Sequence, residues 1–374
     1  MKNPFYVYGY KSSEYFCDRI EETKRLKDAI VNGRNIVLLA ARRMGKTGLI
    51  QHLFHQKEVK SDMFVFYFDI MNTTSKEDFV NQFANAIVGT FSSTSKRLFN
   101  NILDYFKRFN PVVSFDPLSG VPSLELQINS DVQAKSSIIE VFNYLEKLNK
   151  PVCIAIDEFQ QITNYEDQSF EAFLRSHIQH LKNVNFIFSG SQQHILTDMF
   201  HSYSRPFYMS SDFLKLERIN KEEYAKFIVE KFEKSKKEID INEVYKLLDW
   251  LDVYTYYVQN FFNKLWFISS KKVDEKAIDQ AKQYIIDEHD FIYSNLSNLL
   301  TTVQYNLLKA IALEGKVEKP TSKAFIDKYK LGTTSTINSA VKTLIEKELV
   351  WKENGIYKVY DIFMQKWFEA RFKV

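Results

Sequence analysis

The sequence predicts an α/β fold: a doubly wound parallel sheet, followed by an all-helical segment and a C-terminal winged helix-turn-helix. Three observations lead to this prediction. Over residues 1–216, short continuous apolar runs alternate with helical stretches, which is typical of buried parallel strands joined by crossover helices. From 217 to about 300 the apolar spacing is helical throughout. From 301 to 374, three helical patterns are followed by a pair of strand-like runs.

Five apolar runs in the first part have the character of buried strands. They are Ile36–Ala40, Met63–Phe68, Val152–Ile156, Phe186–Phe188 and Phe213–Leu216. The helical stretches between them are Glu21–Asn32, Gly45–Phe54, Lys76–Phe91, Phe170–Leu181 and His194–Phe200. The alternation predicts one core domain over residues 1–216. A segment at about 111–129 interrupts it with Pro117, Gly120 and Pro122 between two strand-like pieces, Val112–Phe115 and Leu124–Ile128. We expect an inserted hairpin or an extended loop there.

The remaining chain predicts two further units. Asn220, followed by two glutamates, has the features of a helix start, and residues 217–300 form an expected all-helical second unit. Residues 301–374 form the expected winged helix-turn-helix. Its first helix ends at Gly315, its second covers Ser322–Tyr329, and its third begins at the polar run 333–336. Two strand-like pieces then meet at Asn354-Gly355, the strongest short signal for a hairpin.

Composition limits the class of protein. The chain has 374 residues, of which 45% are hydrophobic, so it can form two or three compact units with real cores. Its two cysteines, Cys17 and Cys153, give neither a disulfide framework nor a Cys/His metal spacing. No apolar run reaches the length of a membrane span, and residues 1–30 lack a signal sequence, which predicts a cytosolic protein.

Charge is almost balanced, at +3 overall, but it is not evenly distributed. Residues 295–374 contain 13 Lys/Arg and 8 Asp/Glu, an excess of +5. Such an excess is found in nucleic-acid-binding modules, and equally as an ordinary fluctuation of composition.

A phosphate-binding loop is predicted between the first strand and the helix that follows it. The sequence AARRMGKT at residues 40–47 matches G-x-x-x-x-G-K-[ST] except that Ala40 replaces the first glycine. In such loops the glycine lets the backbone approach a phosphate, the lysine reaches the β- and γ-phosphates, and the hydroxyl ligates Mg²⁺. The loop therefore predicts ATP and Mg²⁺ as ligands. The predicted nucleotide-binding residues here are Ala41, Arg42, Arg43, Met44, Gly45, Lys46, Thr47 and Gly48. The two arginines either form a solvated loop surface or contact a partner.

An acidic pair ends the third predicted strand. The sequence VCIAIDE at residues 152–158 has the Walker B pattern, a buried strand followed by two acids. Asp157 is expected to orient Mg²⁺ together with Thr47, and Glu158 to activate the attacking water as general base, with Lys46 on the phosphates. Both motifs lie at carboxyl ends of strands, where ligands bind in open α/β sheets.

Two further polar positions are candidates for the same site. Ser189 and Ser191 follow the fourth strand, where a side chain could sense the γ-phosphate or hold the water; Ser191 could equally cap the next helix. Arg205 could add positive charge to the phosphate transition state as a catalytic residue, or pair with a surface carboxylate.

These motifs together resemble the archaeal-type ATPases, the MNS branch of the STAND class of P-loop NTPases. The matching residues are Phe16-Cys17-Asp18-Arg19 with Glu22, residues 40–47, 154–158 and 186–192, Arg205-Pro206-Phe207-Tyr208, and the winged helix. The resemblance implies an ASCE-type, AAA-like core with sheet order 5-1-4-3-2, a helical lid and a winged helix. It also implies that Tyr15, Phe16 and Arg19 lie near the adenine, whereas spacing alone favours core positions for Tyr15 and Phe16. The lid motif Gly-x-Pro of many relatives is replaced here by Val253-Tyr254-Thr255.

The leading hypothesis is a slow Mg²⁺-dependent ATPase that uses nucleotide as a conformational switch. The alternative is a protein-interaction scaffold that holds ATP with little or no hydrolysis, and Glu158 discriminates between the two. A small-molecule kinase fits poorly, since no acceptor site follows the core. The third helix of the winged unit carries Ser335, Thr336, Asn338, Ser339 and Lys342, and its wing Lys352 and Lys358. These residues suit duplex DNA, whereas Glu353 at the wing tip opposes it, so DNA and a protein partner both stay open. Oligomer formation also stays open.

Overall fold

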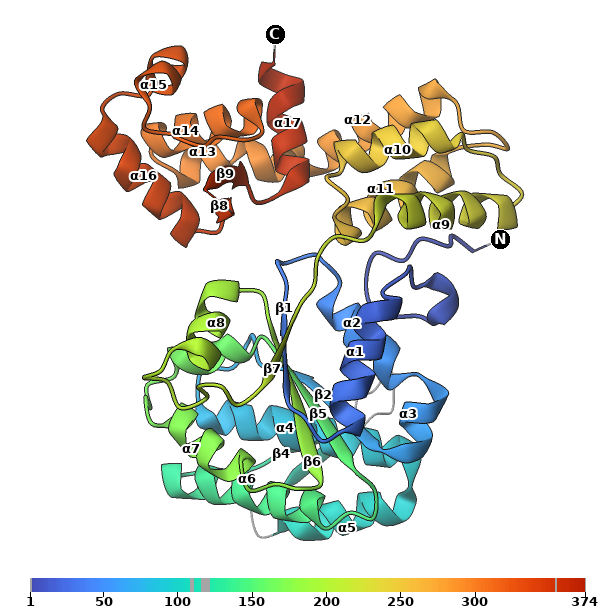
Figure 1. Ribbon diagram of the computed structural model, residues 1–374, viewed down its shortest axis with the longest axis vertical. Helices are drawn as coiled ribbons and strands as arrows, with labels where there is room; N and C mark the ends of the chain where they lie inside the picture. Colours follow the sequence, from blue (N-terminus) through green and yellow to red (C-terminus); the bar gives the residue numbers. More distant parts are fainter. Residues whose placement is uncertain (1, 108–110, 116–121, 354, 374) are drawn as a thin grey trace. The chain divides into compact units, whose positions relative to one another are not determined.

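The computed structural model describes residues 2–107, 111–115, 122–353 and 355–373. The chain divides into two compact units (Figure 1). We call Tyr8–Ile219 the core unit. The second, which we call the helical unit, combines Met1–Val7 with Asn220–Val374. The backbone therefore passes between the two units twice, once on each side of the core unit.

The core unit is an α/β domain around one five-stranded sheet. Its strands are β1 (Ile36–Leu39), β2 (Phe64–Asp69), β5 (Val152–Asp157), β6 (Val184–Gly190) and β7 (Asp212–Lys215). They lie in the order β2-β5-β6-β1-β7, and every neighbouring pair is parallel. This confirms the predicted doubly wound sheet and the order 5-1-4-3-2 that the resemblance implied. Strands β1, β5 and β6 are buried along their whole length, which explains their continuous apolar sequences.

Helices connect the strands of the core unit. They are α1 (Ile20–Val31), α2 (Lys46–Phe54), α3 (Lys57–Asp62), α4 (Lys76–Thr94), α5 (Lys96–Phe106), α6 (Asp131–Glu146), α7 (Phe170–Ile178) and α8 (Gln193–His201), with 3-10 turns η1 (Ser13–Tyr15) and η3 (Phe159–Asn164). An aromatic core joins one face of the sheet to α4 and α6; it includes Phe66, Phe68, Phe83, Phe142 and Phe186. On the other face, Asn185 of β6 donates to the Ile30 carbonyl oxygen of α1 at 2.6 Å.

The inserted hairpin is present in the core unit. Strands β3 (Val112–Phe115) and β4 (Pro122–Glu125) pair antiparallel, and β4 packs on α4. The second strand begins at Pro122 rather than at the predicted Leu124, since Asn85 and Asn81 of α4 accept from the N–H groups of Leu124 and Leu126 and fix this register. The predicted turn residues Pro117 and Gly120 lie outside the described residues.

The helical unit contains the helices of the predicted all-helical segment and the winged helix. Its elements are α9 (Lys221–Lys234), α10 (Ile241–Trp250), α11 (Thr255–Ile268), α12 (Glu275–Ser294), α13 (Leu296–Leu299), α14 (Thr302–Glu314), α15 (Lys323–Tyr329), α16 (Thr334–Glu346), β8 (Val350–Glu353), β9 (Ile356–Val359) and α17 (Ile362–Phe372). Strands β8 and β9 pair antiparallel, and Val317 adds a bridge to Tyr357 of β9. Asn354 of the predicted turn lies outside the described residues.

The ends of the winged-helix elements follow from local chemistry. Thr301 and Gln304 form a reciprocal capping box at the start of α14, and Gly315 ends that helix with φ 73°. Ser322 and Thr333 cap α15 and α16 through their side chains. Among the helices of the described ranges, none is both long and apolar enough to cross a membrane.

Candidate nucleotide site

The phosphate-binding loop joins β1 to α2 as predicted. Gly45 precedes the helix with φ 92°, a backbone conformation that favours glycine. Ala40 is fully buried and is not among the positive-φ residues, and its carbonyl oxygen lies 3.4 Å from Lys46 Nζ. The first position of the loop therefore needs a small side chain, not a left-handed backbone. This explains why alanine can replace glycine there.

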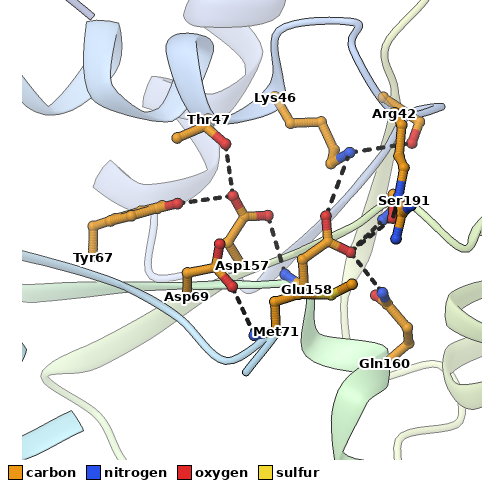
Figure 2. Close-up of polar contacts among 11 residues, drawn as sticks. Arg42, Lys46, Thr47, Tyr67, Asp69, Met71, Asp157, Glu158, Gln160 and Ser191 are labelled. Atoms are coloured by element: carbon orange, nitrogen blue, oxygen red, sulfur yellow. Dashed lines mark hydrogen bonds and ion pairs between the residues drawn. The ribbon is translucent and has the colours of Figure 1, made fainter. Parts of the chain in front are cut away.

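Lys46 lies at the centre of the candidate site (Figure 2). Its side chain is 7% exposed, and Nζ is 4.0 Å from Glu158 Oε1. Burial lowers the pKa of the Lys46 ammonium, while the carboxylates of Glu158 and Asp157 act in the opposite direction. The ammonium is thus a poorly hydrated cation held beside two acids, an arrangement that suits capture of an anionic ligand.

Asp157 is a buried carboxylate that joins the loop to the second motif. Its Oδ2 accepts from Thr47 Oγ1 at 2.7 Å and from the Tyr67 hydroxyl at 2.9 Å. Its Oδ1 accepts from the Glu158 N–H at 3.1 Å. Thr47 and Asp157 are therefore brought together as the sequence predicts. Tyr67 was not predicted; burial and the nearby Asp157 raise the pKa of its phenol, so it stays a hydrogen-bond donor.

Glu158 follows the strand in a left-handed conformation, with φ 56°. This conformation is costly for a residue other than glycine and is common at functional sites. Its Oε2 accepts from Gln160 Nε2 at 2.6 Å, Ser191 N–H at 3.1 Å and Ser191 Oγ at 2.8 Å (Figure 2). Its Oε1 is the atom that faces Lys46. One carboxylate oxygen is thus saturated by donors and the other faces the loop.

Asp69 is a third carboxylate at this edge of the sheet, and it was not predicted. Parallel register places it directly beside Asp157. Loss of hydration raises the pKa of Asp69, and the charges of Asp157 and Glu158 add to this; the Met71 N–H, which donates to it at 2.7 Å, and Lys46 oppose the shift. Finding it from sequence would need the knowledge that β2 and β5 are neighbours in this register.

The serines after β6 have different places. Ser191 contacts Glu158, and Arg42 Nε lies 3.4 Å from the Ser191 hydroxyl, so Arg42, Ser191 and Glu158 form one chain of contacts (Figure 2). Ser191 does not cap α8, whose N-cap residue is Gln192. Ser189 is fully buried, and within the described part of the chain its hydroxyl has no hydrogen-bond partner. The contact with Glu158 therefore belongs to Ser191, while a nucleotide contact of Ser189 stays a prediction.

Arg205 is not brought together with Lys46 and Glu158. Its Nη2 forms an ion pair with Glu171 Oε2 at 2.6 Å, and Asp198 Oδ2 lies 3.7 Å from its Nε. Pairing with a carboxylate, the alternative that the sequence left open, is what the structure shows. The catalytic role of Arg205 stays a prediction.

The N-terminal residues flank the loop helix. The ring of Phe16 stacks on His52 of α2, with centroids 4.2 Å apart, and lies near Gly48. Arg19 is 3% exposed, and its guanidinium donates to Glu22 and to the Glu217 and Met44 carbonyl oxygens. Arg19 thus ties this segment to the loop by way of Met44, and Phe16 presents an aromatic face next to α2.

The winged helix presents a polar face on α16. Ser335, Thr336, Asn338, Ser339 and Lys342 are all exposed, as predicted. Lys342 lies 3.8 Å from Glu346. Lys358 was expected to be available to DNA on the wing, but its side chain is only 14% exposed and its Nζ lies 3.5 Å from Asp252 Oδ2. The wing therefore offers Lys352 but not Lys358 to a ligand while this ion pair is kept.

Comparison with known proteins agrees with this architecture. Residues 16–252 match the model of an ATPase domain predominantly from Archaea, and residues 291–370 match a probable winged helix domain. No functionally curated protein matches the chain. The first match covers more than half of the sequence and includes the loop, Asp157 and Glu158.

Solved structures share the fold at low identity. A Walker-type ATPase of Pyrococcus abyssi, paby2304, is 17% identical with a TM-score of 0.67, covering 98% of this chain and 99% of that one. The Aeropyrum pernix ORC2 protein, solved as ADPNP–ADP complexes, is 12% identical with a TM-score of 0.57, covering 100% and 99%. The Aeropyrum pernix ORC1 protein in complex with DNA is 12% identical with a TM-score of 0.50, covering 95% and 93%. From its matched domain and its loop, this chain belongs to the family of P-loop ATPase domains found predominantly in Archaea, here followed by a winged helix domain.

Proposed function

We propose that the chain binds ATP with Mg²⁺ at the loop of residues 41–48, hydrolyses it slowly, and uses the nucleotide as a conformational switch. The observation that carries the proposal is the meeting of four side chains at the carboxyl edge of the sheet. Thr47 lies 2.7 Å from Asp157, and Lys46 lies 4.0 Å from Glu158. These are a hydroxyl, a carboxylate, an ammonium and a second carboxylate, the set that nucleoside triphosphate hydrolysis requires.

The residues present fit a magnesium ion held jointly by protein and phosphates. Among the described residues, no group of three or more His, Cys, Asp and Glu side chains could hold a metal on its own. Mg²⁺ in nucleotide sites needs less, because it keeps several waters and uses one or two protein oxygens plus the phosphates. Thr47 Oγ1 would supply one of those oxygens, and Asp157 would orient the ion through its water shell. When bound, the ion would neutralise charge that develops on the phosphates.

Glu158 is the proposed general base. A water that attacks the γ-phosphorus must lose a proton as the bond to the β–γ bridging oxygen breaks, and the products are ADP and inorganic phosphate. The Glu158 carboxylate accepts that proton through the oxygen that faces Lys46. Its other oxygen is held by Ser191 and Gln160, so the acceptor has a fixed direction.

A Glu158→Gln variant separates the ATPase from the scaffold that only holds ATP. Glutamine keeps an acceptor oxygen for Ser191 and nearly the same shape but cannot take up a proton, and general bases contribute about 10²–10⁴-fold. We expect ATP affinity to be unchanged by calorimetry and phosphate release to fall by about 100-fold or more. The control is Glu166→Gln, an exposed glutamate. Hydrolysis at the parent rate in Glu158→Gln would show that Glu158 is not the base.

The proposed nucleobase contact involves Phe16. Phe16 stacks on His52 of α2 and lies next to Gly48 of the same helix, which begins at Lys46. Arg19 supports this position through Met44 rather than by an open charge. Aromatic faces of this kind suit a purine ring by stacking.

The switch proposal depends on how the chain is divided. The segment that leads to Phe16 starts in the helical unit, where Phe5 is 1% exposed and packs its ring on Phe232 and Phe262. There the Asn3 side chain donates to the Asn263 carbonyl oxygen, and the Asn263 side chain donates to the Phe5 carbonyl oxygen. A change at the nucleotide site can therefore act on the helical unit through both chain crossings.

We propose duplex DNA as the ligand of the winged helix. The support is the exposed polar face of α16, defined above, and the excess of basic residues in this part of the chain. The ORC1 protein that shares the fold was solved in complex with DNA. Docking of a protein on the same face is the other outcome of the test given in the Discussion.

A further inference from the structure

Gln160 holds the Glu158 carboxylate from the turn that follows β5. Gln160 lies two residues after Glu158 on η3, is 4% exposed, and donates from Nε2 to Glu158 Oε2 at 2.6 Å. Its own carbonyl oxygen Oε1 is buried and has no hydrogen-bond partner among the residues that the structure describes. The side chain thus leaves one polar atom unsatisfied while it keeps the bond to Glu158, and leaving a buried acceptor unpaired costs free energy.

Gly190 at the end of β6 makes room for this amide. A Cβ atom at position 190 would lie 2.0 Å from Gln160 Oε1, closer than two such atoms approach, and 3.1 Å from its Cδ, an unusually tight contact. Gly190 is not among the positive-φ residues, so its backbone does not itself require glycine. The absence of a side chain at 190 is what allows the Gln160 amide to reach Glu158.

We propose that Gln160 is a positioning residue for ATP hydrolysis, seated against Gly190, and that together with Ser191 it fixes the Glu158 carboxylate. With the Gln160 amide and both Ser191 donors on Oε2, rotation of the carboxylate is blocked, and Oε1 stays on the side of Lys46 where the proton of the water must be taken (Figure 2). This inference rests on the proposed role of Glu158 as the base. It assigns to Gln160 no contact with the nucleotide.

Replacement of Gln160 by methionine is the direct test. Methionine fills nearly the same volume but has no N–H to donate. A misplacement of about 1 Å in a catalytic group can cost about 100-fold in rate, so we expect kcat to fall by about tenfold or more with KM for ATP and ATP affinity unchanged. A loss of general packing would instead lower the melting temperature and affect nucleotide binding as well.

Gln161 provides the matched control. It is the next residue of η3, but its Nε2 donates to the Thr73 carbonyl oxygen at 2.9 Å and its Oε1 accepts from Asn164. Gln161→Met removes the same kind of hydrogen bond from the same turn and leaves Glu158 untouched. We expect kcat of this variant to equal that of the parent.

The contact between Gly190 and the Gln160 amide gives a second test, which compares two single variants with their double variant. In Gly190→Ala the new Cβ displaces the Gln160 amide, so kcat should fall as it does in Gln160→Ala. In the double variant Gly190→Ala, Gln160→Ala, the Gln160 amide that the new Cβ would displace is absent. The remaining tight contact of that Cβ is Leu196 Cδ1 at 3.1 Å, the end of a flexible side chain. We therefore expect the double variant to be no slower than either single one, whereas independent effects would multiply.

Glu158→Gln, measured in parallel, distinguishes failure of this inference from failure of the proposed function. If Glu158→Gln hydrolyses ATP at the parent rate, or the parent shows no hydrolysis, the proposed function fails and the inference with it. If Glu158→Gln is inactive while Gln160→Met has an unchanged or raised kcat, only the positioning role is wrong. Losses that multiply in the Gly190→Ala, Gln160→Ala double variant would also overturn it.

Discussion

Three ionisable side chains at the carboxyl edge of the sheet have displaced pKa values. Burial lowers the pKa of the Lys46 ammonium, and burial raises the pKa values of the Tyr67 phenol and the Asp69 carboxyl. In each case the charged form is penalised because water has been removed around it. At the residue scale the site therefore holds unfavourable charge that a ligand with the opposite charge pattern, phosphates and a cation, would relieve.

The pH dependence of the protein's stability tests whether the charge on Asp69 is penalised in the folded state. Because the pKa of Asp69 is higher in the folded than in the unfolded chain, the native state binds the proton more tightly, and the free energy of unfolding falls as pH rises through the interval between the two values. Asp69→Asn removes this loss and keeps an acceptor oxygen for the Met71 N–H. We expect the melting temperature of the ligand-free variant to exceed that of the parent at pH 7, by a margin that shrinks at acid pH.

The control for Asp69→Asn is Asp62→Asn, which replaces an exposed aspartate at the end of α3 and should not raise the melting temperature at pH 7. An Asp69→Asn variant that melts at or below the parent temperature at pH 7 would mean that the charge on Asp69 is not penalised.

At the residue scale, the sequence predicted the side chains with a motif and missed those without one. Lys46, Thr47, Asp157 and Glu158 meet as expected because their spacing reflects a known strand–loop–helix arrangement. Gln160 and Tyr67 could not be found in this way. Their roles depend on tertiary contacts: Tyr67 of β2 reaches Asp157 of β5, and Gln160 reaches Glu158 only because Gly190 of β6 has no side chain.

At the scale of elements, local signals predicted most strands and many helices. All five parallel strands were recognised because each reads as a continuous apolar run, and β1, β5 and β6 are buried along their whole length. The helix α17 was not predicted. The helix packs on both α12 and α14, so its buried residues lie on more than one side of it. They are Ile362, Phe363, Met364, Trp367 and Phe368. Such a helix has no single apolar stripe for periodicity to reveal.

The capping box of α14 provides a prediction at this scale. Thr301 Oγ1 accepts from the Gln304 N–H at 3.3 Å, and the Gln304 side chain accepts from the Thr301 N–H at 3.1 Å. Loss of a threonine N-cap costs about 1 kcal/mol, so we expect Thr301→Ala to lower the free energy of unfolding of the helical unit by about that amount. Urea unfolding followed by circular dichroism measures it.

Thr302→Ala is the matched control for the cap, since Thr302 is the first residue inside the helix and is also exposed. Equal losses in the two variants would contradict a specific capping role for Thr301.

At the scale of the whole molecule, the backbone enters the core unit once, before Tyr8, and leaves it once, after Ile219. These two crossings connect the proposed nucleotide site to the helical unit. The N-terminal crossing was not predicted, because residues 1–7 carry no signal that assigns them to the helical unit. Their place depends on the burial of Phe5 among distant aromatic rings, which is a tertiary contact. The order of the core, lid and winged-helix segments along the chain was expected from periodicity alone.

DNA binding by the winged helix is tested by its dependence on salt. With Lys358 paired to Asp252, we expect about three phosphate contacts, from Lys342, Lys352 and neighbouring lysines, and hence a log–log slope of about −3 for the association constant against salt. A titration of labelled duplex with the full chain, with and without ATP, measures the slope. Lys342→Ala should weaken binding and make the slope shallower by about 1.

The exposed Lys234 at the end of α9 provides the control, since Lys234→Ala should leave the slope unchanged. Failure to bind duplex even at low salt, in both nucleotide states, would favour a protein partner on the same face of α16.

The central claim is that Lys46 and its loop bind ATP, and isothermal calorimetry of Lys46→Met with Mg²⁺ and ATP tests it most directly. Methionine keeps the buried stem and removes the ammonium, whose lowered pKa shows that its charge is penalised in the ligand-free fold, so the variant should melt no lower than the parent. Hydrogen bonds to charged groups contribute about 1.5–3 kcal/mol. We therefore predict a dissociation constant raised by at least about tenfold, with Lys57→Met, an exposed lysine on α3, binding as the parent does. An unchanged affinity in a folded Lys46→Met variant would contradict the account.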